Sequence, residues 1–126
     1  MKTHKDFDVW KESVDLVTRV YKITKSFPKA EMYGLILQIR KSAVSIPSNI
    51  AEGAARNSDK EFLQYLYISL GSLSELETQL IISKNLEYLK KEDTIFEQVV
   101  TIRQMLLGLI KYLNPKCAVA IKKSSY

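Results

Sequence analysis

The residue types that most often carry catalysis or bind metals are scarce in this chain. It has one histidine, His4, and one cysteine, Cys117. A catalytic triad needs a base that meets a nucleophile, and a di-metal centre in a helical bundle needs Glu-x-x-His pairs, which the sequence lacks. Cys117 has neither a second thiol nor a neighbouring histidine to activate it. The inventory therefore predicts no enzymatic activity, no metal site and no cofactor.

Two further arrangements suggest chemistry but favour structural explanations. Ser42 follows Lys41, yet adjacent helical residues point about 100° apart and do not face each other. The glycines are too dispersed to form a phosphate-binding loop: Gly34, Gly53, Gly71 and Gly108. We expect Gly53 to be either a left-handed helix cap or a point of close contact, and Gly71 to let another backbone approach.

Three glutamates lie in or beside apolar helical stripes: Glu52, Glu75 and Glu77. A carboxylate near a core must be paired or neutralised. Arg40 is the predicted partner of Glu75, provided that their helices are neighbours. Because no nucleophile or metal ligand accompanies these carboxylates, we expect a bridge that fixes helix register or a subunit contact rather than acid–base catalysis.

Basic residues give the sequence its only indication of a ligand. The net charge is +5, from 19 Lys and Arg against 14 Asp and Glu. Phosphate contacts need such charge, and the rings of Tyr65, Tyr67 and Tyr126 are candidates for base stacking. The residues predicted to bind RNA or DNA are Arg19, Lys22, Lys25, Arg40, Lys41, Arg56, Lys122 and Lys123. A solvated helix face is the alternative explanation for each of them.

These side chains must be positioned by helices, because apolar residues recur every three or four positions along most of the chain. The predicted helices span about residues 8–25, 33–55, 58–85 and 91–113. Phe27-Pro28 ends the first, Ser58 caps the third, and Asn85 ends it. Pro47 lies inside the second helix and is expected to bend it. Short connections favour an all-α, antiparallel up-down-up-down four-helix bundle over residues 1–113, followed by a basic tail over 114–126.

The location and assembly of the protein follow from where its apolar residues lie. No apolar run approaches the roughly 20 residues that span a bilayer, and the N-terminus has no apolar region of a signal peptide. We expect a cytoplasmic protein that does not bind membranes. The fourth helix is apolar beyond one stripe, which predicts that it is partly buried between subunits. The residues that widen it are Phe96, Val100, Leu107 and Ile110.

The run QIRKSAVSIPSNIAEG, residues 38–53, resembles the 23S ribosomal RNA intervening-sequence protein family. Further matches lie at residues 69–78 and 108–113 and at Phe7 and Trp10. The resemblance implies an antiparallel bundle in a ring of five subunits, and a relation to the accessory protein of diversity-generating retroelements. It carries over no catalytic residue. The residues predicted as structural or subunit contacts are Arg40, Pro47, Asn49, Glu52, Gly53, Gly71 and Glu75.

Two functional hypotheses follow from the residues and the resemblance together. In the first, a homopentameric, non-catalytic bundle binds RNA or DNA through its basic surface, since some family members are encoded inside 23S ribosomal RNA genes. In the second, the same assembly is a protein-binding scaffold or accessory factor with no nucleic-acid function of its own.

Overall fold

The computed structural model describes residues 3–114, and they form four long helices with two short 3-10 turns. The helices are α1 (Asp8–Thr24), α2 (Leu35–Ala54), α3 (Asp59–Asn85) and α4 (Ile95–Leu113), and the turns are η1 (His4–Asp6) and η2 (Lys29–Glu31). The described residues contain no strand, which confirms the all-α class. None of these helices is long and apolar enough to cross a membrane.

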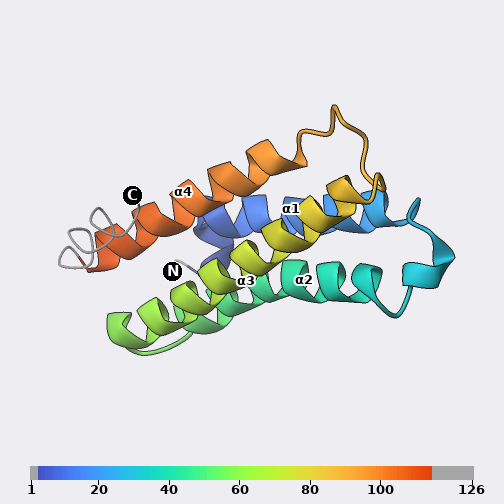
Figure 1. Cartoon of the computed structure of the whole chain (residues 1–126). Coiled ribbons are helices and arrows are strands. Elements are labelled where there is room, and N and C mark those ends of the chain that lie inside the picture. The colour runs from blue at the N-terminus through green and yellow to red at the C-terminus, as the bar shows by residue number, and fades with distance from the viewer. Residues whose placement is uncertain (1–2, 115–126) are drawn as a thin grey trace.

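Each long helix packs against two others. Helix α2 contacts α1 and α3, and α4 contacts α3 and α1, so that α1 and α3 stand diagonally across the core. The α1–α2 and α3–α4 links lie at one end of the molecule and the α2–α3 link lies at the other (Figure 1). This arrangement leaves an outward face on every helix.

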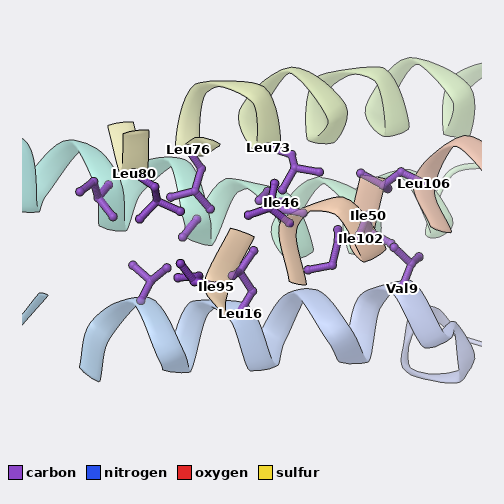
Figure 2. Close-up of a cluster of buried hydrophobic side chains, with 14 of the residues drawn as sticks. Val9, Leu16, Ile46, Ile50, Leu73, Leu76, Leu80, Ile95, Ile102 and Leu106 are labelled. Atoms are coloured by element: carbon purple, nitrogen blue, oxygen red, sulfur yellow. The ribbon is translucent and has the colours of Figure 1, made fainter. Parts of the chain in front are cut away.

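The core is built from leucine, isoleucine and valine side chains that all four helices point inward. Leu16 of α1, Ile46 of α2, Leu73 of α3 and Ile102 of α4 are fully buried and meet in the middle of the molecule (Figure 2). Each such burial contributes about 1.5–3 kcal/mol. The buried positions recur every three or four residues, which is why the periodicity located the helices.

Helix α4 begins at Ile95, four residues later than the sequence predicted. The Oδ1 atom of Asp93 accepts a hydrogen bond from the Ile95 amide at 2.9 Å and thereby satisfies a free amide of the first turn. The guanidinium of Arg19 binds the same carboxylate at 2.8 Å and the Thr94 hydroxyl at 2.7 Å. These contacts hold the preceding segment outside the helix.

Side chains of the α1–α2 link contact a side chain of the α3–α4 link. Phe27 is buried, and its ring lies 5.3 Å from the ring of Tyr88. The Tyr88 hydroxyl donates a hydrogen bond to Glu31 at 3.0 Å. This bond, together with burial, raises the pKa of Tyr88 above its ordinary value of 10.0.

Gly53 is a close-contact point and not a left-handed cap. No glycine in the described residues has a positive φ. A Cβ atom at position 53 would lie 2.6 Å from the Cβ of Tyr65 and 2.9 Å from a ring carbon of Phe62. Gly53 therefore lets α2 and α3 approach each other where they enter their connection. Pro47 is buried in the same helix, and the bend expected there stays a prediction.

Candidate nucleic-acid and subunit interfaces

Positive charge is concentrated in one stretch of the fold. Between Asp15 and Glu52 the chain has six Lys or Arg residues and a single acidic residue, Glu31. This stretch forms the second half of α1, the link through η2, and most of α2. Six cations against this one carboxylate give the stretch a formal net charge of +5.

A groove of about 630 Å³ runs between α1 and α2 in this basic region, and we call it the α1–α2 groove. Its lining contains two cations, Arg40 and Lys41, and no carboxylate. The remaining lining residues are Tyr21, Met32, Tyr33, Ile36, Leu37, Val44 and Ser45. Tyr33 is 90% exposed. The groove thus combines an apolar and aromatic surface with positive charge.

Arg40 is fixed on one wall of the groove. Its guanidinium carbon lies 4.5 Å from the centre of the Tyr21 ring. Its Nε atom donates to the Thr24 hydroxyl at 3.0 Å, and an Nη atom donates to the Tyr21 carbonyl at 3.4 Å. The predicted pair between Arg40 and Glu75 is wrong, because Arg40 lies on the α1 side of α2, whereas Glu75 is exposed on α3 and accepts from Gln79.

The other predicted nucleic-acid residues do not gather at this groove. Arg19 and Lys22 line a separate polar groove between α1 and α4. Arg56 follows the opposite end of α2, roughly 24 Å from Arg40 at 1.5 Å per residue, where it binds Glu52 at 3.2 Å. Lys122 and Lys123 lie outside the described residues. Lys25 is exposed one turn after Tyr21, but it is not among the residues that line the groove.

The tyrosines at the groove were not anticipated from the sequence. Three tyrosines were candidates for base stacking. Tyr65 lies beside Gly53 and its hydroxyl accepts a hydrogen bond from Arg56. Tyr67 lies on the outward side of α3, and Tyr126 lies outside the described residues. Tyr33 immediately precedes Gly34 at the start of α2. The signal available in the sequence was a large aromatic residue, Tyr33, in a short link between helices that also contains lysines.

A row of small polar side chains joins α2 to α3. The hydroxyls of Ser45 and Ser72 are 2.7 Å apart, and Ser42 donates to the amide oxygen of Gln79 at 2.7 Å. The side-chain amide of Asn49, a predicted structural contact, donates to the Ser45 carbonyl at 2.8 Å. These bonds satisfy polar groups within one subunit, and the Ser42 hydroxyl is among the groups that they satisfy.

The half-buried carboxylate of Glu77 is paired, as expected for an acid beside the core. Arg103 of α4 donates to both of its oxygens, at 2.7 and 3.3 Å. Among residues 3–114, no group of three or more His, Cys, Asp and Glu side chains is placed to hold a metal ion. His4 lies in η1, with its ring 5.0 Å from the ring of Trp10.

The outward side of α3 is unusually apolar. Eight exposed residues recur there at spacings of one, three or four, and only one of them is charged. We call them the outer α3 face: Tyr67, Ile68, Gly71, Ser74, Glu75, Thr78, Ile81 and Ile82. Ile68 is 50% exposed and Ile81 is 46% exposed. A Cβ atom added at Gly71 would meet no atom within 4 Å.

Helix α4 leaves less apolar surface uncovered than its sequence suggested. Of the four residues that widen its stripe, Ile110 is fully buried in its own core, and Phe96 and Leu107 are half-buried. Val100 is the exposed one, at 46%. The structure therefore points to α3 more strongly than to α4 as the helix with an uncovered apolar face.

Fold and surfaces together define a small all-helical protein with a cationic groove on one side and an apolar helix face on another. The sequence profile of the 23S rRNA-intervening sequence protein family matches residues 5–108, and the chain belongs to this family. A similar solved structure is a protein of unknown function from the S23 ribosomal protein family of Bacteroides thetaiotaomicron. It is 26% identical with a TM-score of 0.75, and the match covers 82% of this chain and 95% of that chain. Comparison with curated proteins finds no match.

Proposed function

We propose that this protein is a non-catalytic, antiparallel up-down-up-down bundle that assembles into a homo-oligomeric ring and binds RNA through its basic surfaces. The observation that carries the assembly is the outer α3 face, where four large apolar side chains surround Gly71, Ser74 and Thr78. Links at alternating ends of the molecule support the antiparallel topology (Figure 1).

The composition of the outer α3 face favours a second protein surface over water. A solvated helix face normally carries charges, whereas this one carries a single carboxylate over about four turns. Gly71 costs about 1 kcal/mol relative to alanine in a helix interior, and beyond the backbone of its own helix no atom of residues 3–114 lies within 4 Å of a Cβ added there. A neighbouring subunit that packs closely at Gly71 accounts for both features.

A closed ring needs two different surfaces, because each subunit must contact the next in the same head-to-tail manner. The outer α3 face supplies one, and the flank of α4 around Val100 is our candidate for the other. Five copies of a 14.5 kDa chain have a mass of about 72.5 kDa. Sedimentation at micromolar concentration that shows only monomer contradicts the assembly.

Two matched variants locate the subunit contact. Ile68→Asp places a charge on the outer α3 face, and Leu37→Asp places one at a similarly exposed position in the α1–α2 groove, since the two side chains are 50% and 43% exposed. We expect Ile68→Asp to shift the sedimenting species toward monomer and Leu37→Asp to leave it unchanged. The reverse result contradicts the placement of the interface on α3 and assigns it to the groove.

The RNA component of the proposal rests on charge and on the family. A charge of +5 per chain becomes about +25 in a five-membered ring, which attracts polyanions. The family is described as 23S rRNA-intervening sequence proteins. If phosphate contacts drive binding, the logarithm of the affinity falls linearly with the logarithm of salt concentration. Titration of labelled RNA that shows no binding even at about 50 mM salt contradicts this component.

The alternative is an assembled scaffold or accessory factor that binds a protein, which would follow if the family is related to the accessory protein of diversity-generating retroelements. The outer α3 face supports this function as well, if its occupant is a different protein. Co-purification from the native host distinguishes the two: an oligomer that carries a stoichiometric protein partner favours the scaffold, and an oligomer that carries only RNA favours our proposal.

A further inference from the structure

We propose that the α1–α2 groove binds unpaired nucleobases, so that the protein selects single-stranded over duplex RNA. This inference rests on the proposed RNA-binding function and deepens it, because it names the form of the nucleic acid and the residues that distinguish it. The base-stacking residue is Tyr33, and the charges that accompany it belong to Arg40 and Lys41.

The ring of Tyr33 lies uncovered at the groove. Its side chain is 90% exposed, although an aromatic ring is among the largest apolar surfaces that a protein can bury. It borders a groove of about 630 Å³, within the size range of small-molecule sites. Every nucleobase has an apolar face that stacks on such a ring, so unpaired RNA covers this surface without requiring a particular sequence.

The charge around the groove is positive. Arg40 and Lys41 are part of its lining, Lys25 is exposed one turn beyond Tyr21, and the lining has no carboxylate. An anionic ligand is therefore complementary to the groove. A phosphate-bearing chain matches this charge, and an uncharged apolar ligand would leave Lys41 without a partner.

Arg40 is held in place by its own subunit. Three contacts hold its guanidinium, at 4.5 Å from the Tyr21 ring centre, 3.0 Å from the Thr24 hydroxyl and 3.4 Å from the Tyr21 carbonyl. A guanidinium held this way is a flat, cationic surface, and arginine planes stack on bases as aromatic rings do. Tyr33 and the Arg40–Tyr21 pair thus give the groove two surfaces that suit planar groups.

The orientation of bases explains why the groove favours single strands. In a duplex the faces of the bases are stacked on one another and are not available to a side chain, whereas unpaired bases turn outward and stack on aromatic residues. Phosphate contacts alone do not distinguish single strands from duplexes, because both forms of RNA carry phosphates. Selectivity for single strands therefore reports the groove separately from the general basic charge.

The experiment measures binding of three fluorescent probes to the full chain by anisotropy: an oligo(A) RNA of about 12 nucleotides, a duplex RNA of equal length, and an abasic single strand with the same number of phosphates. We expect the protein to bind oligo(A) most tightly. Tyr33→Ala should weaken oligo(A) binding by about 5- to 150-fold, the equivalent of one stacked base, and leave the abasic strand unaffected.

Matched controls separate the groove from the remainder of the surface. Tyr112→Ala removes another highly exposed tyrosine, at 80%, from the last turn of α4 and should change nothing. Lys60→Gln, at an exposed position in the first turn of α3, is the charge-matched control for Lys41→Gln. Lys41→Gln should weaken oligo(A) and abasic binding equally, since a lysine that contacts phosphate is indifferent to the bases.

Three outcomes of the binding experiment would overturn the inference, each for a different reason. Absence of binding to all three probes at about 50 mM salt overturns the RNA-binding function itself. Equal affinity for the single strand and the duplex, with Tyr33→Ala unchanged, overturns the groove and leaves RNA binding to other basic residues. Tight binding of an acidic amphipathic peptide that Tyr33→Ala abolishes, without RNA binding, assigns the groove to a protein partner and also overturns the inference.

Discussion

Replacing Gly53 by alanine tests the close approach of α2 and α3. The new Cβ atom would lie 2.6 Å from the Cβ of Tyr65 and 3.3 Å from the carbonyl oxygen of Phe62. Favourable carbon–carbon contacts lie at about 3.5–4.0 Å, so α2 and α3 must separate by about 1 Å. Neither neighbouring atom is the end of a flexible side chain, so the separation has to come from the backbone.

The expected magnitude is the difference between two opposing effects. Alanine improves helix propensity by about 1 kcal/mol, and overpacking at a site with no free space costs about 3 kcal/mol. The net change is a loss of about 2 kcal/mol in the free energy of unfolding. At about 4 °C per kcal/mol for a chain of this size, the melting temperature falls by about 8 °C.

Gly108→Ala is the matched control. Position 108 lies in the interior of α4, and an added Cβ atom meets nothing within 4 Å. Propensity alone then predicts a gain of about 1 kcal/mol, or about 4 °C. Both variants are measured by thermal and urea unfolding at one protein concentration, because assembly makes stability concentration-dependent. If Gly53→Ala is as stable as Gly108→Ala, the close packing at position 53 does not limit the fold.

Three further predictions concern other contacts. The bond to Glu31 raises the folded-state pKa of Tyr88, so the stability that this bond contributes is complete below pH 10 and is lost as the pH rises through the folded pKa. From pH 8 upward, the free energy of unfolding measured with urea should therefore fall more steeply for the parent than for Tyr88→Phe. Parallel curves would contradict this. Glu77→Gln and Arg103→Gln should each lower the free energy of unfolding by about 1 kcal/mol and the double variant by little more, whereas fully additive losses would show that the two residues do not act as a pair. Gly71→Leu should leave the fold of the subunit intact by circular dichroism and weaken assembly in sedimentation, and an unchanged oligomer would remove Gly71 from the interface.

The sequence predicted features that depend on neighbouring residues better than features that depend on contacts between distant residues. Helix ends set by local chemistry were predicted well: Phe27-Pro28 and Asn85 end helices as expected, and the Ser58 hydroxyl accepts from the Glu61 amide. The start of α4 was wrong because the bonds that fix Asp93 come from Arg19, which is distant in sequence. A propensity pattern contains no such long-range contact.

The same limit explains the candidate sites. The sequence identified Glu77 as an acid that needs a partner, but Arg103 could be assigned only from the packing of α3 against α4. The proposed partner of Glu75 was wrong for the same reason, since the side of α2 that carries Arg40 faces α1. Membership in the family was predictable from the residues 38–53, because a motif is recognised without three-dimensional information.

The arginines and lysines of this fold have different roles, and the difference bears on where a polyanion binds. All four arginines bond to their own subunit: Arg19 to Asp93, Arg40 to Thr24, Arg56 to Glu52 and Arg103 to Glu77. Their guanidinium groups connect helices or stabilise their ends. An arginine position in the sequence is thus weak evidence for an RNA site unless, as with Arg40, its guanidinium also lines a groove.

The exposed lysines give the stronger evidence, but only where another feature accompanies them. Lys22 borders a groove that also contains Glu12, Asp15 and Glu97, whose negative charge opposes a phosphate. Lys41 borders a groove with an exposed tyrosine and no carboxylate. If charge alone governed binding, removing Lys22 or Lys41 would weaken RNA binding equally; if the groove governs it, only the loss of Lys41 has a large effect.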